Sequence, residues 1–252
     1  MDSKQLARKA ISLLDLTNLN DDCTDEAIEA LCAKAQTPYG NTAAVCVWPR
    51  FVKKAGEYLK GTGIKIATVV NFPQGGESLE ATLDETVKAI ADGADEIDLV
   101  IPYKAFLAQR RGFAETMVLR VKAALPETVR LKTILETGEL KDPAIIRAAS
   151  DMAITAGADF IKTSTGKVSV NATPEAAEIM IKAIADSGKP VGFKPAGGVR
   201  SLDDAGVYLA IAEKHMGADW ASPETFRFGA SGVLDALIAV MEGETAEAGE
   251  GY

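Results

Sequence analysis

Short hydrophobic runs alternate with longer amphipathic stretches along the chain. Most runs are apolar on both faces, which is typical of strands buried on both sides of a parallel sheet. Eight runs are candidate strands: 11–16, 43–48, 64–71, 96–101, 129–136, 160–164, 191–194 and 225–229. The clearest helical patterns between them are 79–91, 142–155, 174–187 and 202–216.

Capping residues and glycines bound several of these helices. A capping side chain precedes a proline at Asp142, Thr173 and Ser222, and this order is typical of a helix start. Three repeats of the form Gly-Ala-Asp end helical patterns, at 93–95, 157–159 and 217–219. Strand, helix, glycine stop and strand form the βαβ unit, which requires a parallel sheet.

This repeated unit predicts an α/β protein built as a single (β/α)8 TIM barrel. No Gly-x-Gly-x-x-Gly follows the first strand, so a barrel is favoured over a dinucleotide-binding open sheet. The predicted barrel covers residues 1–241. The acidic, glycine-containing segment 242–252 is predicted to be a flexible tail.

Composition narrows the possible functions. The 252 residues carry 27 Lys and Arg against 36 Asp and Glu, a net charge of −9, and 47% are hydrophobic. This balance is typical of a globular protein, and the acidic excess argues against nucleic acid or an anionic membrane as a partner. The single histidine, His215, argues against a Ser-His-Asp triad and a histidine-rich metal site.

The cysteines and the N-terminus indicate a reducing cytoplasm. Three cysteines without a Cys-x-x-Cys pair give neither a disulfide framework nor a four-cysteine zinc site. The first residues lack the unbroken apolar core of a secretory signal, and no stretch reaches the length of a membrane span.

Polar side chains interrupt the candidate strands, where a barrel strand should be apolar. Because barrel active sites lie at the carboxyl ends of the strands, these residues are candidates for the site. Alternate residues of a strand face the same side, so Lys132 and Glu136 should share a face, as should Lys162 and Ser164. The candidates are Asp15, Thr17, Cys46, Asn71, Asp98, Lys132, Glu136, Lys162, Ser164 and Lys194.

Two lysines in consecutive apolar runs suggest a nucleophile. A lysine amine attacks only when neutral, and both desolvation and a neighbouring cation promote the neutral form. Lys162 lies in the middle of one run and Lys194 closes the next, so one lysine could attack while the other lowers its pKa. The alternative is a pair of structural lysines, each bound to a carboxylate such as Glu136 or Asp98.

Glycine-rich loops after the late strands predict an anion site. They are 164–167, 196–201 and 228–232, and Lys167 and Arg200 could add positive charge. This is where barrels commonly bind phosphate. Ordinary tight turns are the alternative interpretation.

Long motifs in the chain closely resemble the deoxyribose-phosphate aldolase family of class I aldolases. They are FIKTSTGKVSVNATPE, VGFKPAGGVRS, GADEIDLVIPY, LKTILETGELKD, NTAAVCVWPRF and RFGAS, and the resemblance covers nearly the whole chain. It implies a (β/α)8 barrel without metal or organic cofactor. It also implies reversible cleavage of 2-deoxy-D-ribose 5-phosphate to D-glyceraldehyde 3-phosphate and acetaldehyde, with sugar phosphates and aldehydes as the partners of a monomer or homodimer.

The resemblance also implies residue roles. Lys162 corresponds to the lysine that forms the Schiff base, Lys194 to its activating neighbour and Asp98 to the proton relay that works through water. Phosphate-binding positions correspond to Gly166, Lys167, Gly197, Gly198, Val199, Arg200, Gly229 and Ser231. Positions lining the pocket correspond to Asp15, Thr17, Cys46, Lys132 and Thr165.

Three points depart from the family pattern or stay open. Gly232 stands where close relatives carry a serine that can donate a hydrogen bond to phosphate. The terminal Tyr252 could act as a proton relay, as in family members with this ending, or the tail could serve only solubility. Two rival functions remain: another Schiff-base barrel lyase, such as a transaldolase or a fructose-bisphosphate aldolase relative, and a barrel that binds a sugar phosphate for regulation.

Overall fold

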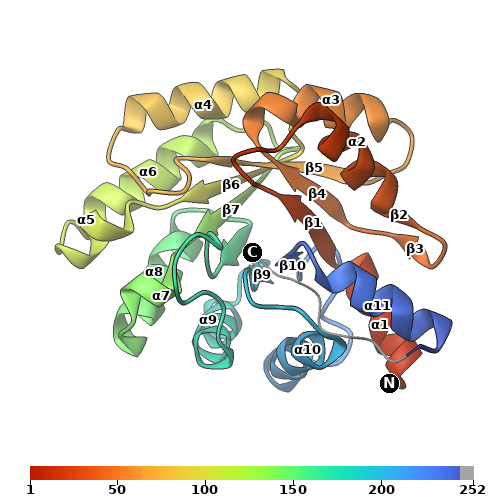
Figure 1. Ribbon diagram of the computed structural model, residues 1–252. Coiled ribbons are helices and arrows are strands. Elements are labelled where there is room, and N and C mark those ends of the chain that lie inside the picture. The colour runs from red at the N-terminus through yellow and green to blue at the C-terminus, as the bar shows by residue number, and fades with distance from the viewer. Residues whose placement is uncertain (245–252) are drawn as a thin grey trace.

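Eight parallel strands form a nearly closed barrel with helices around it, in a computed structural model that describes residues 1–244 (Figure 1). The sheet order is β10-β1-β4-β5-β6-β7-β8-β9, and every neighbouring pair is parallel. The barrel strands are β1 (Leu14–Asn18), β4 (Ala44–Val47), β5 (Lys65–Val70), β6 (Glu96–Val100), β7 (Arg130–Ile134), β8 (Phe160–Lys162), β9 (Gly192–Lys194) and β10 (Phe228–Ala230).

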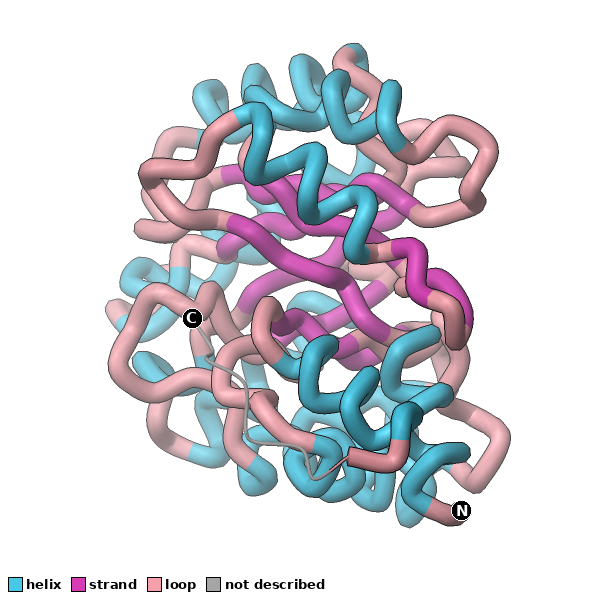
Figure 2. The backbone as a smooth tube through the Cα atoms, turned by 45° about the vertical axis from the view of Figure 1, so that its right-hand side comes forward, coloured by secondary structure: helices cyan, strands magenta, loops and turns pink. Residues whose placement is uncertain are grey.

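Isolated bridges close the gap between β9 and β10. They join Phe193 to Phe226 and Ala196 to Gly229, both in the parallel sense. The predicted (β/α)8 fold is thus confirmed, and the strands lie inside the ring of helices in both views (Figures 1 and 2).

The helices lie mainly between successive strands. They are α1 (Ser3–Ser12), α2 (Asp25–Lys34), α3 (Val52–Tyr58), α4 (Leu79–Ala91), α5 (Tyr103–Leu107), α6 (Arg111–Ala124), α7 (Thr137–Leu140), α8 (Pro143–Thr155), α9 (Pro174–Ser187), α10 (Leu202–Met216) and α11 (Val233–Glu242). The chain also forms a short 3-10 helix, Pro49–Phe51, and a hairpin of β2 (Gln36–Thr37) and β3 (Gly40–Asn41). No helix within residues 1–244 is long and apolar enough to span a membrane.

Caps explain why the four clearest helical patterns begin and end as predicted. The Asp142 side chain accepts hydrogen bonds from the first turn of α8, and the Thr173 hydroxyl accepts one from Ala176 N in α9. At the other end, Gly93, Gly157 and Gly217 have φ values of 100°, 95° and 94°. Glycine adopts this left-handed region without steric cost, so each stops a helix.

Several predicted boundaries are wrong; for example, β7 ends at Ile134 rather than at 136, and β10 begins at Phe228 rather than at 225. Two further errors have a clear local cause. Residues 11 and 12 belong to helix α1, whose first residues follow a capping box at Asp2, and the strand begins only at Leu14. Ser222-Pro223 begins a turn rather than a helix, because Thr225 N and Phe226 N both donate to the Ser222 carbonyl before the chain becomes extended.

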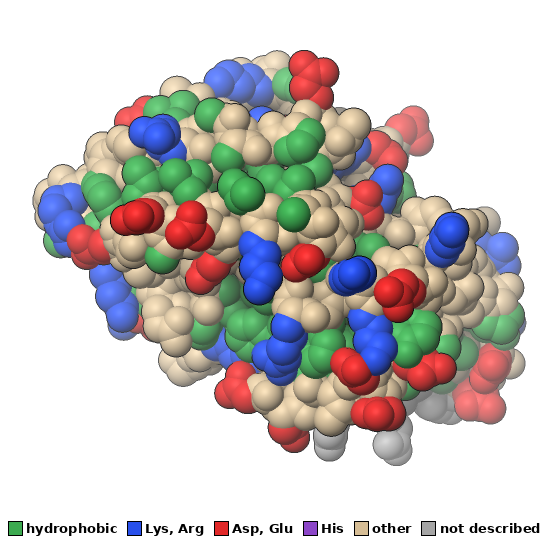
Figure 3. Space-filling model, turned by 90° about the horizontal axis from the view of Figure 1, so that it is seen from above, with side chains coloured by type: hydrophobic (Ala, Val, Ile, Leu, Met, Phe, Trp, Pro, Cys, Tyr) green, Lys and Arg blue, Asp and Glu red, His purple; other side chains and the backbone are tan. Residues whose placement is uncertain are grey.

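The surface and the core follow the usual division. Basic and acidic side chains are interspersed over the face of the molecule seen in Figure 3. The large apolar core fills the space between strands and helices, and includes Leu16 and Leu135. A small second cluster inside the barrel joins Cys46 to Leu19, Ala67 and Val69.

Candidate active site

Seven charged side chains meet in the barrel interior, and we call them the lysine cluster. Each is at most 3% exposed, although charged groups are rarely buried in proteins. Six strands or their approaches supply them: Asp15 from β1, Glu96 and Asp98 from β6, Lys132 from β7, Lys162 from β8, Lys194 from β9, and Arg227 just before β10.

Asp98 is the centre of the cluster. Its Oδ2 accepts hydrogen bonds from Lys162 Nζ and Lys194 Nζ, each at 2.8 Å. Its Oδ1 accepts from Lys132 Nζ at 3.1 Å. Strand register produces this meeting, since Asp98 pairs with Lys132 across β6 and β7, and Lys162 pairs with Lys194 across β8 and β9.

A second layer of ion pairs lies beneath Asp98. Lys194 Nζ also binds Asp15 Oδ2 at 2.5 Å, and Asp15 Oδ1 accepts from Arg227 Nη1 at 2.6 Å. Lys132 Nζ binds Glu96 Oε2 and lies 3.2 Å from Asp15 Oδ2. Every lysine in the barrel therefore has at least one carboxylate partner.

The partners are unequally shared, and this singles out Lys162. Lys132 binds three carboxylates and Lys194 binds two, whereas Lys162 binds only Asp98 and shares it with both other lysines. Burial lowers the pKa of Lys162 below its ordinary value, and the Lys194 cation lowers it further against the opposing pull of Asp98. Burial would lower the pKa of Lys194 too, but Asp15 and Asp98 raise it well above its usual range.

Charge balance leads to the same lysine. The cluster holds four cationic groups, Lys132, Lys162, Lys194 and Arg227, against the carboxylates of Asp15, Glu96 and Asp98. It is neutral when one amine loses its proton, and a buried site favours that state. The carboxylates raise the pKa values of Lys132 and Lys194, whereas that of Lys162 is lowered, so Lys162 is the amine that loses its proton most readily.

The carboxylates are held in their ionised form. Burial alone would raise the pKa of Asp98, but Lys132, Lys162 and Lys194 lower it well below its ordinary value. The pKa of Asp15 is lowered in the same way by Lys132, Lys194 and Arg227. Both side chains are therefore carboxylates near neutral pH and accept hydrogen bonds from the lysines around them.

Two members of the cluster, Glu96 and Arg227, were missed among the sequence candidates. Strand parity could have found Glu96, since it lies two residues before Asp98 and so faces the same side of β6. Arg227 lies in the RFGAS motif, two residues before Gly229, and an arginine entering a barrel strand carries the same signal as a lysine.

Three loops come together at the carboxyl ends of β8, β9 and β10. Gly197 N donates to the Gly229 carbonyl at 3.2 Å, and Ala172 N donates to the Ala196 carbonyl at 3.3 Å. On the loops after β9 and β10, four backbone N–H groups have no acceptor within residues 1–244: those of Gly198, Val199, Ser231 and Gly232. Converging free amides before helices α10 and α11 are suited to an anion.

Asn171 joins two of the three loops, through contacts with Gly166 and Gly197. This residue was not among the candidates predicted from the sequence. Its Oδ1 accepts from Gly166 N at 3.1 Å, and its side chain packs against Gly197, where an added Cβ would lie 2.7 Å from Asn171 Cβ. The Lys167 amine donates to the Leu19 carbonyl at 2.8 Å, so its cation lies beside the end of β1. Arg200 is exposed at the rim of the loops.

The remaining predicted pocket residues lie around the cluster. Cys46 is fully buried, and burial raises the pKa of its thiol. The Thr17 hydroxyl donates to the Asp15 carbonyl at 2.8 Å. Thr165 donates to Glu136 through both its backbone N and its hydroxyl, at 3.1 and 2.6 Å.

Glu136 does not share a face with Lys132 as strand parity predicts. β7 ends at Ile134, and Glu136 adopts a left-handed conformation with φ 59°, which turns its side chain toward Thr165. Both Lys162 and Lys194 are paired to a carboxylate, Asp98, as the structural alternative expects, whereas Glu136 binds a threonine. Burial raises the pKa of Glu136.

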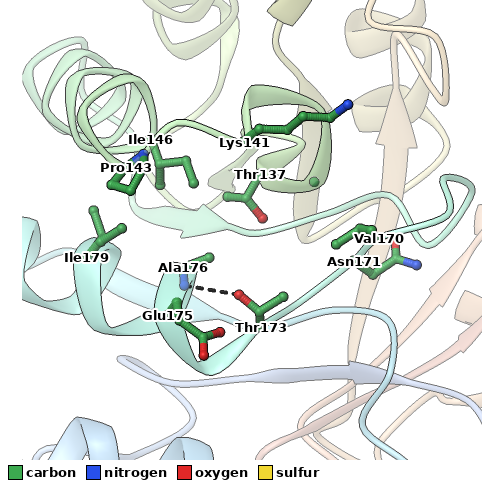
Figure 4. A pocket seen from close by; sticks show the side chains of 11 residues that line it. Thr137, Lys141, Pro143, Ile146, Val170, Asn171, Thr173, Glu175, Ala176 and Ile179 are labelled. Atoms are coloured by element: carbon green, nitrogen blue, oxygen red, sulfur yellow. Dashed lines mark hydrogen bonds between the residues drawn. The ribbon is translucent and has the colours of Figure 1, made fainter.

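A separate cavity of about 320 Å³ lies between α7, α8 and α9 (Figure 4). Apolar side chains such as Ile146, Val170 and Ile179 line it, and the Thr137 hydroxyl at its wall has no hydrogen-bond partner in the described part of the chain. Its lining includes Asn171, which contacts Gly166 and Gly197, and no member of the lysine cluster.

Two further expectations concern a metal and the tail. Within residues 1–244 no group of three or more His, Cys, Asp or Glu side chains is arranged to hold a metal ion. Tyr252 and most of the predicted tail lie outside the described residues, while Glu242, its first residue, ends helix α11.

The family model and a curated relative that match this chain are both aldolases. The family model described as DeoC/LacD family aldolase matches residues 9–233. A deoxyribose-phosphate aldolase of Agrobacterium fabrum is 57% identical over 251 residues, which cover 99% of this chain and 97% of the relative.

Solved structures agree in fold. The apo form of a proposed deoxyribose-phosphate aldolase from Toxoplasma gondii matches with a TM-score of 0.87 and 27% identity over 96% of this chain and 98% of that one. A tetrameric deoxyribose phosphate aldolase from Aeropyrum pernix matches with a TM-score of 0.77 and 25% identity, over 95% and 97% of the two chains.

Proposed function

Because the chain belongs to the DeoC/LacD family of aldolases, we propose that it is a class I aldolase acting on 2-deoxy-D-ribose 5-phosphate. It reversibly cleaves this sugar phosphate to D-glyceraldehyde 3-phosphate and acetaldehyde. The observation that carries the proposal is a buried lysine, Lys162, whose pKa is lowered and which lies beside loops with free amides for a phosphate.

The first stage forms a Schiff base on Lys162. Its neutral amine attacks the aldehyde carbon C1 of the open-chain sugar, and loss of water leaves a protonated imine. The imine is the electron sink that the reaction needs, because the bond to be cleaved lies next to it. Lys194, held as a cation by Asp15 and Asp98, lowers the pKa of the Lys162 amine and so favours its neutral form.

The second stage breaks the bond between C2 and C3. A base removes the proton of the C3 hydroxyl, C3 becomes the aldehyde of glyceraldehyde 3-phosphate, and the bonding electrons pass into the imine to give an enamine. Protonation of the enamine carbon and hydrolysis of the imine then release acetaldehyde and Lys162. Asp98, ionised and 2.8 Å from Lys162 Nζ, is the group placed to handle these protons through water.

Phosphate binding positions the substrate away from the reacting carbons. The free amides of Gly198, Val199, Ser231 and Gly232 and the Lys167 cation supply the anion site. Binding energy from a remote group orients the aldehyde for attack. The backbone N–H of Gly232 remains available even though this chain lacks a hydroxyl there.

Trapping the imine tests the proposal. Incubation with acetaldehyde and borohydride should add one ethyl group, and peptide mass spectrometry should locate it on Lys162. Lys162→Ala should abolish both trapping and cleavage of deoxyribose 5-phosphate, whereas the exposed-lysine control Lys182→Ala should keep both. An ethyl group on Lys194, or trapping that persists in Lys162→Ala, would contradict the assignment.

The same assay separates the rival functions. Substituting dihydroxyacetone for acetaldehyde tests for a transaldolase or a fructose-bisphosphate aldolase relative, and we expect a clear preference for acetaldehyde. A barrel that only binds sugar phosphate would show no trapping.

The location and the assembly of the protein stay predictions. We expect it to act in a reducing cytoplasm, because its three cysteines are free. We expect a monomer or a homodimer.

A further inference from the structure

Arg227 and Glu96 form the floor of the lysine cluster, at the opposite end of the barrel from the three loops. Glu96 is the first residue of β6, and Arg227 directly precedes β10. Both line a cavity of about 300 Å³ together with Lys65 and Arg130, which begin β5 and β7. The pair therefore lies at the amino ends of the strands, where barrel enzymes do not bind substrate.

The pair is held in a fixed geometry. Arg227 Nη2 donates to Glu96 Oε1 at 2.8 Å, and Arg227 Nη1 donates to Glu96 Oε2 at 3.1 Å, so the contact is a two-point fork. The Arg227 Nε donates to the Pro223 carbonyl at 2.5 Å. The guanidinium carbon of Arg227 lies 5.8 Å from the centre of the Phe160 ring. Phe160 precedes Lys162 by two residues on β8.

Two chains of ion pairs rise from this floor and meet at Asp98. One runs from Arg227 through Asp15 to Lys194, and the other runs from Glu96 through Lys132. Both lysines then bind Asp98, the partner of Lys162. A change of charge at the floor is thus transmitted to the nucleophile through fixed, buried contacts, where electrostatic interactions are strong.

We propose that Arg227 and Glu96 are positioning residues for the aldol reaction, and that Arg227 supplies the cation that leaves Lys162 as the amine without a proton. The proposal rests on the proposed function. With Arg227 present, four cationic groups face three carboxylates, and neutrality requires one amine to lose its proton. Without Arg227, three protonated lysines would balance the three carboxylates, and Lys162 would keep its proton.

Glu96 has the opposite effect on charge. It balances Arg227 and binds Lys132, so its removal leaves four cationic groups against Asp15 and Asp98 alone. The other groups near Lys162 are Cys46 from β4 and Glu136 beyond β7, while β5 contributes the apolar Ala67 and Val69 to the interior. Neither Cys46 nor Glu136 forms an ion pair with Arg227 or Glu96, so the floor pair acts through the lysine cluster.

The test measures kcat/KM for deoxyribose 5-phosphate as a function of pH, because its acid limb reports the deprotonation of the nucleophile in the free enzyme. Arg227→Gln should move this limb to higher pH and Glu96→Gln should move it to lower pH. A unit charge about 10 Å from an amine, at an effective dielectric constant of about 20, changes its pKa by about one. We therefore expect displacements of about one pH unit in opposite directions.

The double variant Glu96→Gln/Arg227→Gln restores the excess of one cationic group, so its limb should return toward the wild-type position. Arg147→Gln is the matched control, since it removes an arginine from exposed ion pairs with Asp151 and Asp186 on the outside of the barrel. It should leave the limb in place. Thermal unfolding of each variant, followed by circular dichroism, shows that the pH profiles come from folded protein.

The outcomes separate this proposal from the proposed function. If wild-type protein cleaves deoxyribose 5-phosphate and is trapped on Lys162 but both single variants lose activity with unmoved acid limbs, the pair is only structural. Limbs that move in the same direction also overturn the proposal. If a single variant does not fold, the double variant and Arg227→Lys test the proposal instead. Both leave the cluster with one cationic group in excess, so both must keep the acid limb near its wild-type pH. Failure of the wild type itself to trap acetaldehyde overturns the proposed function instead.

Discussion

Replacing Lys194 by methionine removes a buried cation and keeps a side chain of similar length. The amines of Lys194 and Lys162 both lie 2.8 Å from the same oxygen of Asp98, so they are at most twice that distance, 5.6 Å, apart. At an effective dielectric constant of about 20, two unit charges at this separation repel by about 3 kcal/mol. This corresponds to about two pKa units on Lys162.

The sign follows from the loss of a neighbouring cation. In Lys194→Met the protonated form of Lys162 is favoured, so its pKa rises and the fraction of neutral amine at pH 7 falls by up to about 100-fold. We expect kcat/KM at pH 7 to fall by up to this factor and to recover in part as the pH is raised through the new pKa. Lys194→Arg keeps the charge and should leave the acid limb near its wild-type position.

The assay is the pH profile of kcat/KM for deoxyribose 5-phosphate, with borohydride trapping by acetaldehyde at each pH as a direct measure of the reactive amine. A Lys194→Met enzyme whose activity falls equally at all pH values, with its acid limb unmoved, would refute the reasoning. Lys194 would then act on a proton of the substrate rather than on the pKa of Lys162. Breaking a buried pair destabilises a protein by about 3–5 kcal/mol, so thermal unfolding must accompany the kinetics.

Three further predictions test the phosphate loops, the packing of the barrel and the tail. Lys167→Met should raise KM by about 10–100-fold with little change in kcat, because a charged hydrogen bond contributes about 1.5–3 kcal/mol and acts on the phosphate; a fall in kcat alone would argue against this role. Gly192→Ala should lower the free energy of unfolding, measured by calorimetry, by about 1–3 kcal/mol, because the added Cβ would lie 2.4 Å from Phe160 Cε1. The control Gly112→Ala should show no such loss, because a Cβ at Gly112 meets nothing within 4 Å. Deletion of Tyr252, which lies outside the described residues, should lower kcat more than it changes KM, and unchanged exchange of acetaldehyde methyl protons with deuterated solvent would leave the tail without a catalytic role.

Local signals allowed much of the barrel to be predicted from the sequence. α4, α9 and α10 have the predicted bounds, because apolar periodicity, a capping hydroxyl and a glycine stop are all encoded within a few residues. The errors arose where local signals conflict with their surroundings. Ser222-Pro223 has a cap-and-proline pair but no amphipathic stretch behind it to bury, and Glu136 lies beyond the end of a strand, where alternation no longer applies.

The sequence by itself determined five of the seven members of the lysine cluster, since strand parity and motif together selected Asp15, Asp98, Lys132, Lys162 and Lys194. Only the tertiary structure decided how their charges are shared. Asp15 and Arg227 are 212 residues apart, and their contact arises because β10 closes the barrel against β1. The loops after β8, β9 and β10 likewise meet through strand register and through Asn171. The pKa of a buried amine depends on the positions of all the charges around it, so the order of strands in the barrel, rather than any single motif, makes Lys162 the lysine of the cluster whose pKa is lowered.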